Sequence, residues 1–279
     1  MSNLINYCIQ QILKNDSILH LISISNFLKY PFFRVKDKKE ICYNYLVKIF
    51  KSIFYQKLYH YIKDKFHLIV ITFLSDKNKF TYIYKNQYWL SFRGKSLSGT
   101  GSDIESTKEL ARHIQAFIHD YKITSIFDVP CGDWEWMKTL KLEHLKYTGA
   151  DIVSEIIENN NKKFKSNYIS FKVCDLRSDQ LVNADLLIVR DLFFHLKLKD
   201  IQRCLDNIKK YKFKYIALTN YPECHTNNDT FIGDRWRPIN LTKSPFLLKS
   251  PALSLSDPSS PNAKKTNKQL SIWEYKDIY

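Results

Sequence analysis

Short acidic motifs recur in the second half of this 279-residue chain, each at the end of a run of apolar residues. The first is Asp128-Val-Pro130-Cys-Gly132-Asp133, which overlaps the apolar run at residues 125–129. A glycine there lets the backbone approach a ligand closely, and two carboxylates suit a cationic ligand better than a pyrophosphate. Because only one of the three glycines of a dinucleotide-binding turn is present, the motif argues against a dinucleotide.

Two further acids end the next two apolar runs. Asp151, followed by Ile152, closes residues 147–151 and comes 19 residues after Gly132, where an acid in a doubly wound sheet hydrogen-bonds ribose hydroxyls. Asp175, followed by Leu176, comes after residues 169–173 and is placed to reach the exocyclic amine of adenine. One acid after a strand is weak support because Asp is common in turns. Three acids at one sheet edge predict a nucleoside-binding site.

A histidine follows the most apolar run of the chain, residues 184–190, in the segment Arg190-Asp191-Leu-Phe-Phe-His195. An imidazole near neutrality takes the proton of a hydroxyl group as its oxygen attacks, so His195 is the candidate general base. A histidine packed among its apolar neighbours is the alternative. Arg190 and Asp191 form either an internal ion pair or part of the substrate pocket, and we favour the pocket.

A later polar segment supplies candidate substrate-binding residues. Trp236, Arg237 and Asn240 lie in the sequence Trp-Arg-Pro-Ile-Asn after the last predicted parallel strand. An arginine beside an aromatic ring binds a phosphate or a carboxylate with the ring as a wall. The alternative is a packed structural turn that ends at Pro238.

Hydrophobic periodicity predicts the elements that position these residues. From residue 124 onward, short apolar runs alternate with helical segments, which predicts an α/β fold with a parallel sheet covered by helices on both faces. An amphipathic helix of about four turns precedes them, and Ser102 with Glu105, or Ser106 with Glu109, fits a capping box at its start. The predicted strands are 125–129, 147–151, 169–173, 184–190, 215–220 and, after a Pro- and Ser-rich excursion at 251–269, 270–275; the predicted helices are 134–145, 153–165 and 197–211.

Glycine usage marks a boundary between two regions. No glycine precedes Gly94, and three then fall within residues 94–101, which predicts a loop. The region before it is aromatic and lysine-rich and has apolar residues at helical intervals over 43–64. We therefore predict a mainly helical appendage at residues 1–92 and an α/β domain at residues 93–279.

The formal charge of +15 is concentrated near the N-terminus. Residues 1–95 hold 16 Lys and Arg against five acids, a net of +11, which leaves +4 for the rest of the chain. Such a region attracts nucleic acid, an anionic lipid surface or an acidic small substrate, and it is equally typical of a solvated lysine-rich surface.

Composition indicates a folded protein of a reducing compartment. Apolar residues make up 44% of the chain, and the six cysteines show neither a C-x-x-C pair nor zinc-like spacing with the eight histidines, so we expect no metal site. The longest apolar run, residues 67–74, is far shorter than the roughly 18 residues of a membrane span, and no signal peptide is recognisable. We expect a cytoplasmic protein, with peripheral membrane contact through the basic region as an open alternative and no indication of oligomeric state.

Taken together, the motifs resemble those of class I S-adenosylmethionine-dependent methyltransferases over about residues 80–279. The resemblance is strongest to a bacterial subfamily with a PCGD-x-x-W-M first motif, an SGxGS loop (here residues 98–102) and a WRPxN segment (here residues 236–240). It implies S-adenosylmethionine as cofactor and a Rossmann-like, seven-stranded sheet whose last strand is antiparallel. The implied cofactor contacts are Asp128, Pro130, Gly132, Asp133, Asp151, Ile152, Asp175, Leu176 and Arg190.

Three functions remain open at this point. The favoured one is O-methylation of a small molecule or glycan precursor, with His195 as base, because a histidine soon after the fourth strand has this part in several small-molecule O-methyltransferases. The second is RNA methylation, in which the basic N-terminal region would bind the phosphates of the RNA. The third is a non-catalytic binding protein on the same fold, against which the retained acidic positions argue.

Overall fold

The computed structural model describes residues 67, 69–91, 94–230, 236–259 and 266–278. Contacts divide the chain into two compact units, Met1–Val70 and Ile71–Tyr279. The second unit contains every element described below, and it begins earlier than the boundary predicted between residues 92 and 93. The helix predicted at residues 43–64 lies outside the described residues.

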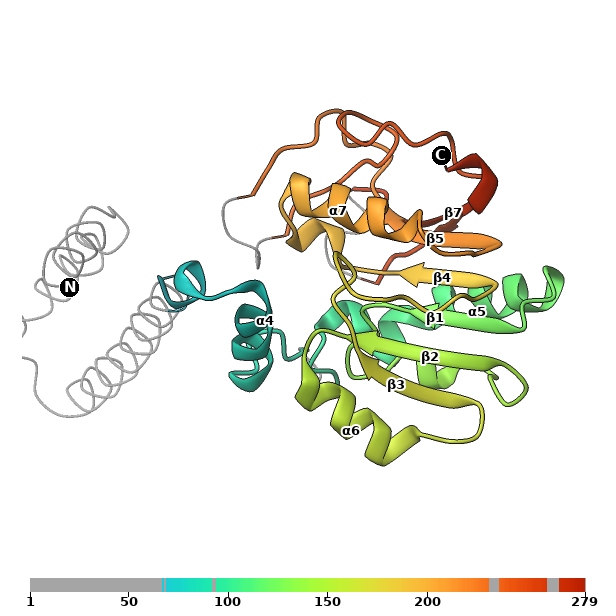
Figure 1. Cartoon of the computed structure of the whole chain (residues 1–279), viewed down its shortest axis with the longest axis horizontal. Coiled ribbons are helices and arrows are strands. Elements are labelled where there is room, and N and C mark those ends of the chain that lie inside the picture. Colours follow the sequence, from blue (N-terminus) through green and yellow to red (C-terminus); the bar gives the residue numbers. More distant parts are fainter. Residues whose placement is uncertain (1–66, 68, 92–93, 231–235, 260–265, 279) are drawn as a thin grey trace, which may run out of the picture. The chain divides into compact units, whose positions relative to one another are not determined.

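Seven strands form one sheet in the order β3-β2-β1-β4-β5-β7-β6. Strands β1 to β5 pair in parallel, whereas β7 is antiparallel to both β5 and β6 (Figure 1). This confirms the expected Rossmann-like sheet, and its strand order reverses between β1 and β4, where doubly wound sheets bind ligands. The strands are β1 Ser125–Asp128, β2 Lys146–Asp151, β3 Ile169–Val173, β4 Leu186–Val189, β5 Tyr215–Asn220, β6 Leu253–Ser256 and β7 Gln269–Glu274.

Each of the six predicted strands is present, with ends shifted by no more than two residues. Their signal was strong because β4 is buried along its whole length and β2 and β5 along nearly all of theirs. Strand β6 was missed because its four residues lie within the predicted excursion and only one of them is buried. Its pairing with β7 places it at the edge of the sheet, where a strand carries little hydrophobic pattern.

Helices cover both faces of the sheet. Helix α5 (Ile104–Asp120) packs on one face in a hydrophobic cluster that also includes residues of β1, β2 and β7. Helix α7 (Leu198–Ile208) covers the opposite face, so that α5 lies behind the strands and α7 in front of them in Figure 1. The buried residues of α7 recur at helical spacing, namely Ile201, Cys204, Leu205 and Ile208. Helix α6 (Ser154–Phe164) connects β2 to β3.

Two local predictions were wrong. No α-helix forms at residues 134–145, where a single 3-10 turn, Met137–Thr139, lies instead. The first residue of the predicted helix, Trp134, has a φ of 59°, outside the right-handed helical region. The capping boxes do not form either. Helix α5 begins at Ile104 with the buried Asp103 as N-cap, and the side chain of Asp103 makes no capping hydrogen bond.

Helix α4 (Asp76–Lys85) precedes the sheet in the chain and belongs to the same compact unit. Its N-cap Ser75 accepts a hydrogen bond from the backbone N–H of Asn78, and Phe80 and Ile83 are its buried apolar residues. In Figure 1 the carboxyl ends of the parallel strands point toward this helix. Residues 76–91, which the sequence placed in the appendage, therefore help to build the site.

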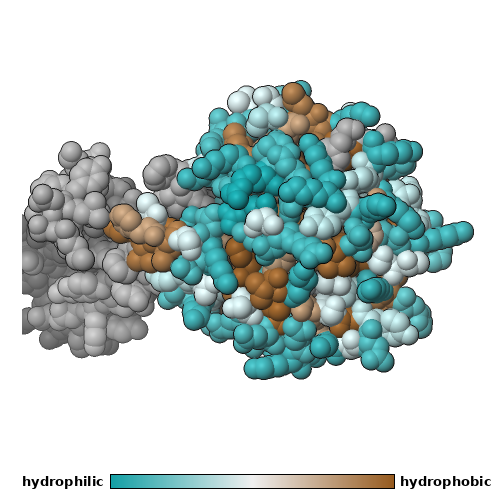
Figure 2. Space-filling view, viewed as in Figure 1, coloured by the Kyte–Doolittle hydropathy of each residue, from teal (hydrophilic) through white to brown (hydrophobic). Residues whose placement is uncertain are grey.

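The face shown in Figure 2 is mainly hydrophilic, with small separate groups of hydrophobic side chains. Exposed large apolar residues such as Phe73 and Leu247 are scattered along the chain, as is usual for protein surfaces. Of the helices in the described part of the chain, none is long and apolar enough to cross a membrane.

Candidate functional site

A cavity of about 330 Å³ opens at the carboxyl edge of the sheet. Its walls come from five places: α4 and the turn after it, the loop at residues 98–102, the turn after β1, the ends of β2 and β4, and the segments flanking β5 and β7. The lining residues are Phe80, Tyr84, Trp89, Ser98, Gly99, Gly101, Ser102, Pro130, Cys131, Gly132, Trp136, Asp151, Ile152, Arg190, Asp191, Leu192, Phe194, His195, Tyr221, Trp236 and Lys268.

The turn after β1 depends on Gly132. Its φ is 53°, and a Cβ there would lie 2.3 Å from the Oγ of Ser98, so only glycine fits. The Gly132 N–H donates to the Asp151 carboxylate at 3.2 Å, and Asn160 donates to the Gly132 carbonyl at 2.8 Å. Gly132 and Pro130 line the cavity, and their contact with a cofactor stays a prediction.

Asp128 and Asp133, the two acids of this turn, do not line the cavity. The Asp133 carboxylate accepts hydrogen bonds from the Leu97 N–H at 2.6 Å and from the hydroxyls of Ser96 and Ser98. Its contacts hold the loop at residues 96–98 against the turn, which is a structural role.

Asp128 is buried behind the turn. The hydroxyl of Tyr147 donates to its carboxylate at 2.6 Å. Burial raises the pKa of Asp128 to about 7, although the Tyr147 hydrogen bond and the charge of Arg190 oppose the rise. The expected direct contact of Asp128 with a cationic ligand therefore has no support in this geometry.

Asp151 and Ile152 lie in the cavity wall at the end of β2. The Asp151 carboxylate accepts hydrogen bonds from the backbone N–H groups of Val153 at 3.0 Å and Gly132 at 3.2 Å. Burial raises the pKa of Asp151 to about 6, and those hydrogen bonds limit the rise. At neutral pH the group is therefore a carboxylate, fixed in place, that can accept further hydrogen bonds from a ligand.

Asp175 and Leu176 line a second, smaller cavity of about 40 Å³. Both carboxylate oxygens of Asp175 accept hydrogen bonds from Arg177, at 2.8 and 2.7 Å. Arg177 also pairs with Asp76, the first residue of α4. Burial alone would raise the pKa of Asp175, but the Arg177 hydrogen bonds lower it below its usual value.

The two cavities are neighbours, as their shared lining residues show. Phe80, Pro130, Ile152 and Leu192 contribute to both. Apolar side chains therefore lie between the acid at the end of β2 and the acid after β3.

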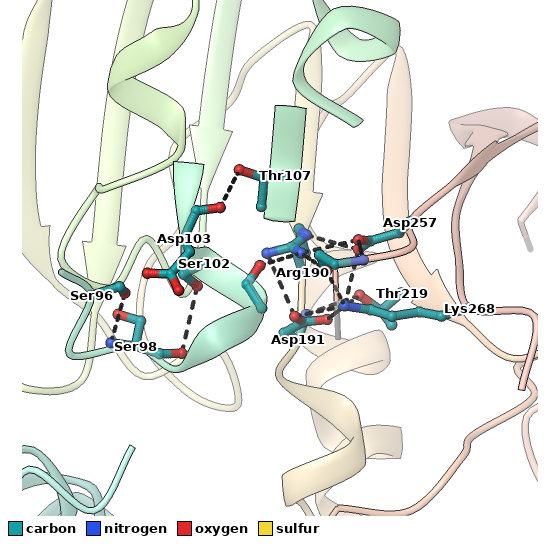
Figure 3. A network of polar contacts seen from close by, with 12 residues as sticks. Ser96, Ser98, Ser102, Asp103, Thr107, Arg190, Asp191, Thr219, Asp257 and Lys268 are labelled. Carbon is teal, nitrogen blue, oxygen red and sulfur yellow. Dashed lines mark hydrogen bonds and ion pairs between the residues drawn. The ribbon is translucent and has the colours of Figure 1, made fainter. Parts of the chain in front are cut away.

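Four charged side chains form a network beside the larger cavity (Figure 3): Arg190, Asp257 and Lys268 are buried and Asp191 is partly exposed. Arg190 donates to Asp257 at 2.9 Å, to Ser259 and to the carbonyl of Gly101. The ammonium of Lys268 lies 2.7 Å from Asp191 and 3.0 Å from Asp257. Burial alone would raise the pKa of Asp257, but Arg190 and Lys268 hold it well below its usual range.

Arg190 and Asp191 thus meet both descriptions that the sequence left open. They belong to an internal ion-pair network, and both line the cavity. Asp191 has a φ of 58°, in the left-handed region that a non-glycine residue rarely adopts, and its backbone N–H donates to Thr219 at 2.9 Å. The guanidinium of Arg190 also lies 5.1 Å from the centre of the Trp136 ring.

His195 ends the 3-10 turn Phe193–His195 and lines the cavity. Its imidazole stacks on Trp89, with ring centres 4.6 Å apart and planes 26° from parallel. The neighbouring Phe194 ring is 4.4 Å away. The ring is therefore held by aromatic contacts in the wall of the cavity.

Only one of the three residues predicted in the Trp-Arg-Pro-Ile-Asn segment reaches the cavity. Trp236 lines it, and its indole N–H donates to the hydroxyl of Tyr221 at 3.0 Å. Arg237 instead donates to the backbone carbonyls of Phe194 and Leu196, at 2.9 and 2.5 Å.

Asn240 is buried, and its side chain donates to the carbonyls of Pro222 and Cys224. Like those of Arg237, its contacts match the structural turn that the sequence offered as the alternative. Neither side chain lines the cavity, so the expectation that both bind substrate gains nothing from the geometry.

Sequence reasoning missed two groups of lining residues. Lys268 and its partner Asp257 lie in the predicted excursion, and no pattern there indicated burial. The second group, Phe80, Tyr84 and Trp89, was missed because these residues precede the predicted domain boundary. Their aromatic side chains were a signal that could have indicated a ligand-binding surface. Among the described residues, no group of three or more His, Cys, Asp or Glu side chains is placed to hold a metal ion.

Comparisons with known proteins give partial structural likenesses. No protein-family model matches the chain. No curated protein matches it either. Among solved structures, the methyltransferase domain of bacterial CtHen1-C is 16% identical over 44% of this chain and 71% of that chain, with a TM-score of 0.38.

Two further solved structures show likenesses of the same order. Human N-acetylserotonin methyltransferase in complex with SAM is 18% identical over 41% of this chain, with a TM-score of 0.36, and the match spans only 34% of that enzyme. Magnesium protoporphyrin IX methyltransferase from Synechocystis PCC 6803 with bound SAM is 12% identical over 56% of this chain and 81% of that chain, with a TM-score of 0.42. At such identities, any function has to be argued from the residues of the site.

Proposed function

We propose that the sheet unit is an S-adenosylmethionine-dependent methyltransferase that acts on a hydroxyl group. The observation that carries the proposal is the pair of adjoining cavities, with Asp151 in the larger, Asp175 in the smaller and apolar residues shared between them. A carboxylate at the end of the second strand is suited to ribose hydroxyls. A second carboxylate further along suits an exocyclic amine, and the apolar residues between them suit the faces of a purine.

The residues present fit this cofactor better than a dinucleotide. The turn after β1 has a single glycine, and its neighbour Asp151 is an anion at neutral pH. Such a turn disfavours a pyrophosphate. Asp151 with Ile152 would hold the ribose, Asp175 with Leu176 the adenine, and Gly132 would let the backbone approach the remaining part. When bound, S-adenosylmethionine supplies an electrophilic methyl group, whose transfer to oxygen breaks the carbon–sulfur bond and leaves the electron pair on sulfur.

The contribution of the chain to the transfer is to take the acceptor's proton. His195 lies in the cavity wall and is held by Trp89 and Phe194, so its imidazole is the best-placed base. Asp191 also lines the cavity, but Lys268 contacts both of its oxygens, which keeps that carboxylate within the ion network. Arg190 and Lys268 fix Asp191 in place.

Calorimetric titration of the full chain with S-adenosylhomocysteine tests the proposal. We expect binding, and we expect Asp151→Asn to weaken it by about 5- to 150-fold, since hydrogen bonds to a charged group contribute roughly 1 to 3 kcal/mol. Glu158→Gln, a change on α6 that touches neither cavity, is the matched control. No heat from the folded wild-type protein would remove the proposed function.

The acceptor class in this proposal is a small molecule or a glycan precursor. Transfer of a labelled methyl group to an extract of such precursors, with His195→Gln as the negative control, identifies it. The charge of the N-terminal region keeps RNA as a second candidate acceptor. RNA binding that is tight, salt-sensitive and lost on deletion of residues 1–66 would favour this second candidate.

A further inference from the structure

Five aromatic rings form a continuous arc along one side of the larger cavity. Trp89 stacks on His195, His195 contacts Phe194, Phe194 contacts Tyr221 and Tyr221 contacts Trp236, with ring centres between 4.4 and 6.2 Å apart. All five residues line the cavity. We call them the ring arc.

The ring arc is assembled from four separate segments. Trp89 follows α4, Phe194 and His195 follow β4, Tyr221 follows β5, and Trp236 lies further along the chain. Hydrogen bonds join three of these segments: Trp236 donates to the Tyr221 hydroxyl, and Arg237 donates to the carbonyl of Phe194. Because the rings come from four segments and all line the cavity, their contacts do not arise from the packing of one helix on its neighbour.

The charges that line the cavity are already balanced within the protein. Among the described lining residues, only Arg190 and Lys268 carry a fixed positive charge, and both are almost fully buried. Each contacts Asp191 and Asp257. A phosphate or carboxylate on the acceptor would have to draw one of these cations away from Asp191 and from the fully buried Asp257, which is costly because Asp257 would keep only one of its two cationic partners.

Another described cation close to the ring arc in the sequence, Arg237, does not line the cavity. Arg237 follows Trp236 directly, yet its guanidinium is occupied by backbone carbonyls, among them those of Asn228, Phe194 and Leu196. Within the part of the chain that the structure describes, the ring arc therefore offers flat apolar faces, the Tyr221 hydroxyl and the His195 imidazole to an entering acceptor, and no cation that is not already paired.

We infer that the part of the acceptor that enters the cavity is an uncharged ring bearing a hydroxyl group, held against the ring arc. The inference rests on the proposed function, because it takes the ring arc to be the acceptor side of a methyl-transfer site. A sugar ring and a phenolic ring share this chemistry: each presents a flat face for stacking and a hydroxyl whose proton His195 accepts. Trp89 and Trp236, at the two ends of the arc, are then specificity-determining residues.

Paired probes test the inference by binding, independently of turnover. The full chain, saturated with S-adenosylhomocysteine, is mixed with methyl glucoside or glucose 6-phosphate, and separately with 4-methylphenol or 4-methylphenyl phosphate. Saturation-transfer NMR reports contact with the protein, and tryptophan fluorescence reports affinity. We expect at least one uncharged probe to bind more tightly than its phosphorylated partner, and the pair that does so shows whether the ring is a sugar or a phenol.

Substitutions then assign the bound probe to the ring arc. Trp236→Leu and Trp89→Leu should each weaken it by about 3- to 10-fold, since aromatic contacts are worth that much, while Trp236→Phe should retain most of the affinity. Tyr168→Leu, an exposed aromatic residue that does not line the cavity, is the control and should change nothing.

The possible failures have different meanings. If S-adenosylhomocysteine itself does not bind, the proposed function fails. If it binds, and the phosphorylated probes bind as well as their uncharged partners, or no uncharged ring binds, this inference alone is overturned. Unchanged affinity in both leucine variants would overturn the assignment to the ring arc.

Discussion

Replacement of Lys268 by methionine should destabilise the sheet unit strongly. The side chain of Lys268 is 1% exposed, and its ammonium lies 2.7 Å from Asp191 and 3.0 Å from Asp257. Methionine has a similar length but no charge, so Arg190 alone would face two carboxylates. Removing one partner of a buried ion pair typically costs about 3 to 5 kcal/mol. For a domain of this size that corresponds to a fall in Tm of about 6 to 20 °C.

Urea denaturation followed by tryptophan fluorescence measures this change. All five tryptophans of the chain lie within residues 71–279, so the signal reports on the sheet unit alone. The matched control is Lys214→Met. Lys214 pairs with Asp185 at 2.7 Å but is 63% exposed, and such a pair should contribute less than about 1 kcal/mol.

A second substitution isolates the charge effect. In the Lys268→Met background, Asp191→Asn removes one of the uncompensated carboxylates, so the double variant should recover part of the lost stability. Because the pKa of Asp257 is lowered in the folded protein, the stability it contributes is present above the pKa of an unfolded aspartate, about 3.9. That contribution is lost as the pH falls toward the folded-state pKa, so the measurements belong at pH 7. Equal destabilisation by Lys268→Met and Lys214→Met, or no recovery in the double variant, would refute the reasoning.

Four further predictions concern single positions. Because the pKa of Asp151 is raised to about 6, protonation should weaken S-adenosylhomocysteine binding as the pH falls through 6, whereas calorimetry should find little such dependence in Asp151→Asn. His195→Gln should lower methyl transfer by about 100- to 10,000-fold with unchanged affinity for the cofactor product; near-normal turnover would show that His195 is a packing residue. Gly132→Ala should lower Tm and cofactor affinity together because its Cβ would lie 2.3 Å from the Ser98 Oγ, and Ser98→Ala should partly restore both in the double variant. Arg237→Gln should lower Tm, since three backbone carbonyls lose a donor, while calorimetric affinity for S-adenosylhomocysteine stays the same; a selective loss of ligand affinity would contradict its structural role.

Sequence alone was sufficient for six of the seven strands and for the place of Asp151 at the edge of the sheet. Buried strands such as β4 and β5 are nearly continuous apolar runs. This pattern can be recognised in the sequence because it arises from the burial of consecutive residues. The position of Asp151 follows for the same reason. Parallel strands joined by helices bring their carboxyl ends to one edge, so an acid that ends a strand has a predictable place.

Only the tertiary structure decided which side chains face the cavity and which are occupied elsewhere. Asp128 and Asp133 have the residue type and spacing of ligand contacts, yet Tyr147 and the loop at 96–98 engage their carboxylates. Nothing in the local sequence records those partners. The charge network likewise joins Arg190 to Asp257 and Lys268 across 67 or more residues of chain. Hydrophobic periodicity reports local burial, whereas pairing of charges and rings depends on contacts between distant segments, which form only when the chain has folded.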